Sequence, residues 1–232
     1  MHASGDSVIG KLVERQMRNW ELARAQRLSA PEPEAREVED FISISRCVGT
    51  AGDEVAAALG EKLGWPVFDK ELLEVMGGDD ELRRQVYDSM DERDLGWCEE
   101  ALRSLIQPEF VRNDYFRRLT ETVLSLARQG HAVFLGRGAD LILPMGVGLR
   151  VRLVASFDTC AAGFAIQAGL PIEEARATVT QLEKERAEFI RHHFGVDPAD
   201  AARHDLVINL DRRTPGQAVE LILAARELAA AP

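Results

Sequence analysis

The sequence predicts an α/β protein in which a parallel sheet is flanked by helices. From Phe41 onward, short β-rich segments alternate with amphipathic helical segments, an order that is typical of parallel strands covered by helices. The chain has 232 residues, of which 46% are hydrophobic and 29% charged, as in an ordinary globular protein with one sizeable core. Ligands of such sheets bind at the carboxyl ends of the strands, so the residues that follow each strand are the candidate functional residues.

The first part of the α/β pattern contains two short strands and their helices. Residues 41–45 form the first predicted strand, residues 49–52 a loop, and a helix with apolar residues at Val55, Ala56, Leu59 and Leu63 then ends near Gly64. Residues 66–68 form a second strand. Residues 70–106 are predicted to be mostly helical, with breaks at the glycines.

The second part of the pattern continues this alternation. A helix over residues 115–127 is closed by Gly130, and strands follow at residues 131–135 and 149–155. A long helix over residues 171–193 has Pro171 in its first turn and ends at Gly195. The last strand is residues 206–210. The final helix begins with Thr214 and Gln217 at the spacing of a capping box.

A separate helix precedes this pattern. Residues 7–28 place apolar side chains at nearly helical spacing, at Ile9, Val13, Met17, Trp20 and Ala23. Residues 29–40 hold two prolines, four glutamates and one aspartate, which is typical of a linker. The sequence therefore predicts a helical extension and linker over residues 1–38 and an α/β domain over residues 39–232. The apolar stripe predicts that the helix packs on its own domain or on a second copy, so a homodimer is one expected arrangement.

Charge excludes some classes of partner. With 28 Lys and Arg against 39 Asp and Glu, the net charge is −11, which disfavours non-specific binding to nucleic acid or to anionic membranes. Arg150 and Arg152 interrupt the best candidate for a membrane span. Charged residues at positions 11, 14 and 15 leave no apolar core for a signal peptide. Three widely spaced cysteines, Cys47, Cys98 and Cys160, predict neither a disulfide framework nor a metal site. We therefore expect a cytoplasmic protein.

The loop after the first strand has two interpretations. A strand, a loop of small residues (Gly49, Thr50, Ala51 and Gly52) and a helix N-terminus suit an anion, because free backbone N–H groups point at it. The pattern GxxxxGK[ST] is not met, since Gly52 stands in place of the lysine and Asp53 in place of the hydroxyl residue. A phosphate site and a simple tight turn both remain open.

Two further segments carry candidate cations. Arg137 lies between two glycines after the strand 131–135 and before Asp140, where a guanidinium can bind phosphate or carboxylate; the alternative is a surface turn. Arg186 and Arg191 lie in the long helix among glutamates, where a solvated face with i,i+4 pairs is the simplest interpretation. The adjacent His192 and His193 are poorly arranged for joint metal ligation, and a helix-end charge is the simpler explanation.

These segments together resemble the cytidylate kinase-like family, a divergent relative of the nucleoside-monophosphate kinases with the P-loop fold. Residues 41–54 resemble the family's opening strand and loop, "ISRxxGSGGxE". Further matches are GWPVFDKELL at residues 64–73, GHAVFLGRGADLIL at 130–143, LRVRLVA at 149–155 and KERA at 184–187. Their order and spacing carry the resemblance, which covers nearly the whole chain.

The resemblance implies specific roles. Gly49, Thr50, Ala51 and Gly52 would hold the phosphates of ATP, which the family uses with Mg²⁺, and Arg46 is a candidate cation beside them. Asp69, Arg137 and Asp140 match positions that face the acceptor nucleotide. Arg186 and Arg191 match arginines of a lid, here about residues 157–195, that closes on the transferring phosphoryl group. Small-molecule nucleotides are the expected ligands, with no nucleic acid and no membrane.

Departures from the family pattern leave three functions open. The loop lysine is absent, and Cys160 stands where the family often has an arginine. The first function is ATP-dependent phosphoryl transfer to a nucleoside monophosphate such as CMP or dCMP. The second is nucleotide binding without turnover. The third is an interaction protein that uses the N-terminal helix.

Overall fold

The computed structural model describes residues 38, 40–70, 72–73, 78, 114–136 and 138–229, with the side chains of 114–116 and 129 left out. The predicted N-terminal helix, nearly all of its linker and most of the helical stretch 70–106 lie outside the described residues. Arg137 also lies outside them, and the other predicted site residues fall in parts of the chain that the structure describes.

The chain forms two compact units. The first comprises residues 1–41, 65–132 and 142–147, and the second comprises residues 42–64, 133–141 and 148–232. In the first unit lie the short strand β2 (Val67–Phe68) and the helix α6 (Asp114–Gln129). The Trp65 ring stacks there on the His131 ring, with centroids 5.0 Å apart. The second unit holds most of the sheet and every predicted site residue except Asp69.

The strands form one five-stranded sheet in the order β2-β3-β1-β4-β5. Besides β2, it contains β1 (Phe41–Arg46), β3 (Ala132–Leu135), β4 (Leu149–Val154) and β5 (Leu206–Asn209). β4 pairs in parallel with β1 on one side and with β5 on the other. The predicted parallel sheet flanked by helices is confirmed, and the strand boundaries differ from the predicted ones by a residue or so.

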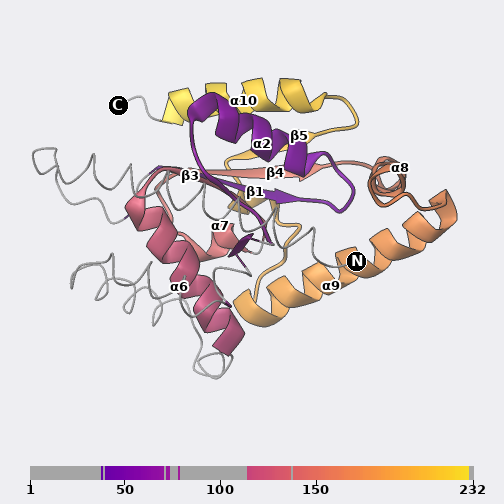
Figure 1. The fold of residues 1–232 in the computed structure, drawn as a ribbon, viewed down its shortest axis with the longest axis horizontal. Helices are drawn as coiled ribbons and strands as arrows, with labels where there is room; N and C mark the ends of the chain where they lie inside the picture. Colours follow the sequence, from indigo (N-terminus) through magenta and orange to yellow (C-terminus); the bar gives the residue numbers. More distant parts are fainter. Residues whose placement is uncertain are drawn as a thin grey trace, which may run out of the picture. The chain divides into compact units, whose positions relative to one another are not determined.

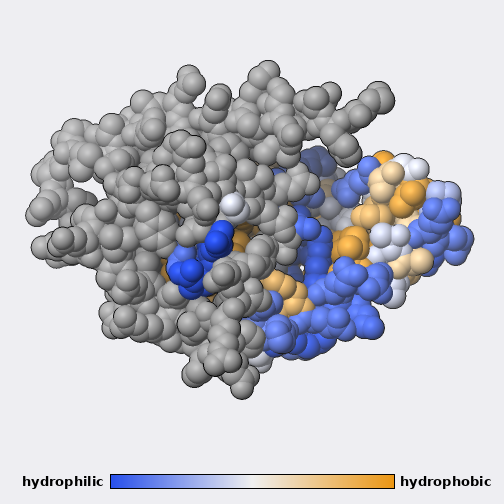
Figure 2. All heavy atoms as spheres, turned by 60° about the horizontal axis from the view of Figure 1, so that its bottom comes forward, coloured by the Kyte–Doolittle hydropathy of each residue, from blue (hydrophilic) through white to orange (hydrophobic). Residues whose placement is uncertain are grey.

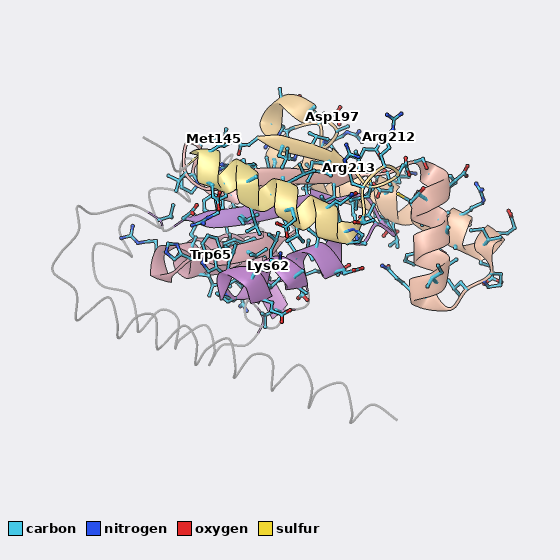
Figure 3. All side chains as sticks on the ribbon, turned by 90° about the horizontal axis from the view of Figure 1, so that it is seen from above. Lys62, Trp65, Met145, Asp197, Arg212 and Arg213 are labelled. Carbon is cyan, nitrogen blue, oxygen red and sulfur yellow. The ribbon has the colours of Figure 1, made fainter. Side chains whose placement is uncertain are left out.

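Two helices cover one face of the central strands. α2 (Gly52–Leu63) and α10 (Pro215–Ala229) lie side by side (Figures 1 and 3), and Val55, Leu59 and Ile222 are fully buried. The Lys62 ammonium donates to the Glu220 carboxylate between them. These helices anchor the sheet through an apolar interface, as the sequence pattern predicts.

The predicted ends of two helices and the predicted start of a third are confirmed. Gly64 and Gly195 have left-handed backbones directly after α2 and α9 (Ile172–Phe194), the conformation that favours glycine at this position. At the start of α10, the Thr214 hydroxyl accepts from the Gln217 N–H at 3.2 Å, and the Gln217 side chain accepts from the Thr214 N–H at 3.1 Å. This is the reciprocal capping box that the sequence predicts. Pro171 is the N-cap of α9 rather than a residue of its first turn.

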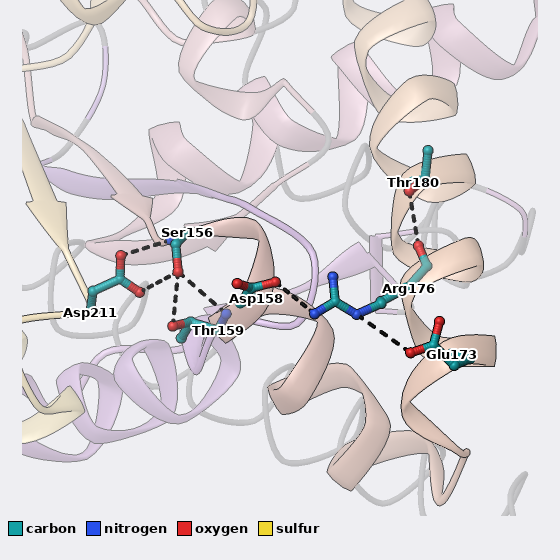
Figure 4. Close-up of polar contacts among 7 residues, drawn as sticks. All are labelled: Ser156, Asp158, Thr159, Glu173, Arg176, Thr180 and Asp211. Atoms are coloured by element: carbon teal, nitrogen blue, oxygen red, sulfur yellow. Dashed lines mark hydrogen bonds and ion pairs between the residues drawn. The ribbon is translucent and has the colours of Figure 1, made fainter.

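A helix that the sequence analysis did not predict, α8 (Phe157–Ala168), precedes α9. The Ser156 hydroxyl caps its N-terminus by accepting from Thr159 N–H at 3.4 Å, and Asp211 accepts from the Ser156 N–H at 2.9 Å (Figure 4). Arg176 of α9 pairs with Asp158 of α8 at 2.7 Å (Figure 4). α8 and α9 thus form a helical hairpin, residues 157–194, whose α9 presents mostly hydrophilic residues on the face seen in Figure 2.

Polar side chains replace apolar ones at part of the central strands. Ser45 and Arg152 are register partners on β1 and β4, and an Arg152 N–H donates to the Ser45 hydroxyl at 3.4 Å. His204 Nε2 lies 3.0 Å from the same hydroxyl, and its Nδ1 lies 3.2 Å from the Asp200 carbonyl. Burial is the main cause that lowers the pKa of His204, so the ring is neutral in the folded protein near pH 7.

No helix among the residues described by the structure is long and apolar enough to cross a membrane.

The burial of His204 predicts that the free energy of unfolding falls as the pH drops. Because burial lowers the pKa of His204 in the folded state, the unfolded chain binds more protons below its ordinary pKa of about 6.5, and the free energy of unfolding decreases from there downward. His204→Gln should make this decrease shallower between pH 7 and 5 in urea titrations. His193, whose pKa is also lowered chiefly by burial, should keep part of the slope. An unchanged slope in His204→Gln contradicts the assignment.

Candidate functional site

The first loop, residues 47–51, joins β1 to α2. The Cys47 N–H donates to the Leu153 carbonyl at 3.1 Å, which extends the pairing of β1 with β4 into the loop. The Thr50 hydroxyl donates to the Cys47 carbonyl at 2.8 Å and closes the turn. Ala51 is the N-cap of α2 and offers no side-chain cap. The helix therefore begins without a side chain that competes for its first N–H groups, an arrangement that suits an anion.

Arg46 lies across the start of this loop. Its guanidinium donates to Asp53 at 3.2 Å, and one of its nitrogens lies 2.5 Å from where a Cβ atom of Gly136 would be. The aliphatic part of the side chain crosses Gly52, since a Cβ atom there would lie 3.0 Å from Arg46 Cδ. The side chain is 14% exposed. The guanidinium thus lies between the first loop and the carboxyl end of β3, and a lysine at position 52 would have to displace it.

A carboxylate binds the first loop. The Val48 N–H donates to the Glu183 carboxylate of α9. A backbone N–H that donates to a carboxylate oxygen has a direction in which it could also donate to a phosphate oxygen. Glu183 therefore occupies part of the place that an anionic ligand of this loop would take.

The loop is also packed closely against α8. A Cβ atom at Gly49 would overlap the Cys160 carbonyl oxygen, and a Cβ atom at Gly163 would overlap the Gly49 carbonyl oxygen. Gly49 has a φ of +78°, which also favours glycine. Val48, Cys160 and Val179 form a buried apolar cluster beside these contacts. Glycine at both positions lets the two backbones meet without a side chain between them.

The two lid arginines of the prediction do not converge. An Arg186 N–H lies 3.5 Å from the Arg46 carbonyl oxygen, beside the end of β1. Arg191 instead pairs with Asp197 at 3.6 Å, and its side chain is 58% exposed. Five helical residues separate them by about 140° around the axis. In this conformation only Arg186 approaches the first loop.

The acceptor-side candidates are placed separately. Asp140 lies at the start of α7 (Ala139–Ile142), 4.0 Å from the Arg203 guanidinium. The backbone around it is fixed by buried Arg150, whose Nε donates to the Asp140 carbonyl at 3.2 Å. Arg137 lies outside the described residues. Asp69 belongs to the first unit, where its carboxylate accepts from the Leu72 N–H at 2.8 Å and caps the following turn.

The sequence did not reveal that Glu183 and Gly163 contact the first loop. Glu183 looked like one of several glutamates on a solvated helix face, because Glu185 and Glu188 alternate with basic residues beside it. Gly163 left a weak signal as the end of a run of small residues in a helix. For His193, burial lowers the pKa, which disfavours the charge expected of a helix-end histidine.

No group of three or more His, Cys, Asp or Glu side chains that could hold a metal ion occurs within the described part of the chain. The loop does fit the phosphates of a nucleotide in one respect, since its Val48 N–H already binds an anionic oxygen. It fits Mg²⁺ less directly, because Asp53, which replaces the usual hydroxyl residue, is paired with Arg46.

Known proteins resemble this chain in sequence and in fold. The model of the "Cytidylate kinase-like family" matches residues 41–212, which include the first loop, the glycine-flanked Arg137 and the helical hairpin. The chain is 30% identical to a "Cytidylate kinase" from Methanopyrus kandleri over 108 residues. That similarity covers 43% of the chain and 56% of the relative, so the chain spans little more than half of its length.

A solved structure supports the fold. The crystal structure of an uncharacterized protein from Eubacterium ventriosum ATCC 27560 aligns over 82% of this chain and 98% of its own, with a TM-score of 0.66 and 20% sequence identity. At this identity the likeness bears on the fold alone.

Close packing of the first loop predicts an unequal response to alanine at two glycines. Gly64→Ala meets no atom within 4 Å and introduces only the strain of a left-handed backbone, about 1 kcal/mol. Gly49→Ala has the same strain and also overlaps Cys160, which adds about 1–3 kcal/mol. Urea titration should show the larger loss of unfolding free energy in Gly49→Ala. Equal losses would mean that α8 does not pack on the loop.

Proposed function

The chain belongs to the cytidylate kinase-like family, and on that premise we propose that it transfers a phosphoryl group from ATP to a nucleoside monophosphate of the CMP or dCMP kind. Phosphoryl transfer needs little covalent chemistry from the protein, which mainly has to position two nucleotides and stabilise the charge that moves between them. The residues of the second unit offer groups for both tasks.

The observation that carries the proposal is the presence of two arginines beside a loop that binds an anionic oxygen. The Arg46 guanidinium lies between Gly52 and Gly136, and Arg186 reaches the Arg46 carbonyl from α9. Cations beside the transferring group offset the missing loop lysine, since a preorganised charge stabilises the negative oxygens of the transition state.

Each candidate residue then has a distinct role. Residues 49–52 hold the phosphates of the donor, and Arg46 and Arg186 face the transferring group. Arg191 turns from Asp197 toward that group when the hairpin, displaced by the entering nucleotide, closes again over it. Asp69, Arg137 and Asp140 bind the acceptor nucleotide. ATP, bound with Mg²⁺, supplies the phosphoryl group.

A second function is favoured by one contact. Because the Glu183 carboxylate binds Val48 N–H and α8 packs on Gly49, a donor nucleotide has to displace part of the hairpin before it can bind. If this displacement is too costly for turnover, the protein is a nucleotide-binding module that reports on a monophosphate without phosphorylating it.

The two functions are separated by one pair of measurements. A coupled assay with ATP, Mg²⁺ and each of CMP, dCMP, UMP and AMP measures turnover, and calorimetry measures binding of the same ligands. Turnover supports the kinase, and binding without turnover supports the silent module. If the protein shows neither turnover nor binding, the interaction role remains. The homodimer through the N-terminal helix and the cytoplasmic location remain predictions from the sequence.

Arg186→Ala should lower kcat at least about tenfold and leave binding of the monophosphate nearly unchanged, because its charge acts on the transferring group. Arg213→Ala is the matched control, since its exposed guanidinium donates to the neighbouring Arg212 carbonyl at 3.2 Å. Equal kcat values for the two variants would show that Arg186 does not act on the transferring phosphoryl group.

Glu183→Ala should strengthen ATP binding by about tenfold, because the loop N–H then no longer has to release a charged hydrogen bond of about 1.5–3 kcal/mol, part of which water replaces. Glu185→Ala removes the same charge from the same helix, but its carboxylate accepts from Gln181 at 2.8 Å and not from the loop. Calorimetry on both variants checks this. A gain of the same size in Glu185→Ala would assign the effect to net charge alone.

A further inference from the structure

Two cysteines meet where the first loop touches α8. Cys47 follows β1 directly, and Cys160 lies in the first turn of α8, where its N–H donates to the Ser156 carbonyl at 3.0 Å. Both are free thiols, Cys47 half-buried and Cys160 buried. The Cys47 side chain packs against the apolar cluster of Val48, Cys160 and Val179. Residues 113 positions apart in the chain thus share one small contact region (160 − 47 = 113).

The backbones on both sides keep the two thiols together. Gly49 lies against the Cys160 carbonyl, and Gly163, one turn further along α8, lies against the Gly49 carbonyl. Cys47 itself is fixed by its hydrogen bond to Leu153 on β4. No side chain separates the loop from α8 at these glycines, and the Cys47 side chain packs on the cluster that holds Cys160. A disulfide would need the two sulfur atoms to turn toward each other.

The two thiols differ in reactivity. Burial, the first cause, raises the pKa of the Cys160 thiol to about 12, and the neighbouring Cys47, Glu183 and Asp211 add to the rise, together with a hydrogen bond to Cys47. Cys160 is therefore protonated near pH 7, whereas Cys47 is partly open to solvent. An oxidant in solution reaches Cys47 first.

We propose that Cys47 and Cys160 form a reversible disulfide that fastens α8 to the first loop. The oxidant is of the hydroperoxide class. Neither cysteine is among the groups proposed to bind nucleotide, and Cys47 lies in the same loop as those groups. The disulfide goes beyond the proposed phosphoryl transfer. Its effect on nucleotide binding rests on that proposed function, and its formation does not.

The chemistry balances in two steps. The Cys47 thiolate attacks one oxygen of hydrogen peroxide, the O–O bond breaks, and with one proton taken up the products are a sulfenic acid and water. The Cys160 sulfur then attacks the sulfenic sulfur, the S–O bond breaks, and the Cys160 proton leaves with the hydroxide as a second water. Both sulfurs are oxidised by one electron each and both peroxide oxygens are reduced. A thiol reductant reverses the bond by exchange.

The disulfide would hold α8 and the first loop together. Closing the bond would hold α8 in the position that covers Gly49 and would keep Glu183 near the Val48 N–H. A donor nucleotide that has to displace the hairpin would then bind more weakly, and reduction would restore its binding.

The test uses the full chain carrying Cys98→Ser, so that Cys47 and Cys160 are the only thiols. After treatment with hydrogen peroxide, intact mass spectrometry should show a loss of about 2 Da, the two thiol hydrogens, and peptide mapping without reductant should give one peptide pair that joins Cys47 to Cys160. Dithiothreitol should restore the original mass. Only added oxygen on either cysteine, with no joined peptides, would overturn the proposal.

Two variants control the geometry. Cys160→Ala, in the same Cys98→Ser chain, should gain oxygen at Cys47 and never lose 2 Da (about the mass of two hydrogens). Gly163→Ala should slow the cross-link several-fold, because its new Cβ forces α8 away from Gly49. An unchanged cross-linking rate in a folded Gly163→Ala variant would contradict the close packing on which the bond depends.

Calorimetry separates this proposal from the proposed function. Oxidised Cys98→Ser protein should bind ATP at least about tenfold more weakly than the reduced protein, about 1.4 kcal/mol. If the reduced protein does not bind ATP at all, the proposed function fails while the mass result still decides the disulfide. Equal ATP affinity with the disulfide formed would overturn the locking effect.

Discussion

The hydrogen bond from the Val48 N–H to the Glu183 carboxylate is the contact on which the state of the site depends. The loop has no lysine, so the groups that could attract an anion there are its backbone N–H groups, the start of α2 and the Arg46 guanidinium. In the structure, a carboxylate of the same chain accepts from one of these N–H groups.

Close backbone packing makes this contact possible. Glycine at positions 49 and 163 lets α8 reach the loop, and α9, which returns from α8, then brings Glu183 and Arg186 to the end of β1. Side chains at either glycine would hold the hairpin away. The hairpin therefore lies against the loop through these two glycines.

Local signals predicted much of the fold. The capping box at Thr214, the left-handed Gly64 and the alternation of strands and helices follow from chemistry within a few residues, and all are present. The role of Glu183 could not be predicted, because a glutamate among alternating charges has the pattern of a solvated face, and its partner lies 135 residues earlier. The direction of Arg46 likewise depends on a glycine brought close by the sheet, Gly136.

On the proposed function, nucleotide replaces Glu183 at the loop and releases the hairpin. Hydrogen–deuterium exchange of the reduced chain, with and without ATP and Mg²⁺, measures the loop and α8 in one experiment. Nucleotide should keep the peptide containing Val48 protected and should make the peptide of α8 exchange faster. Protection of the loop with unchanged exchange in both α8 and α9 would contradict this proposal.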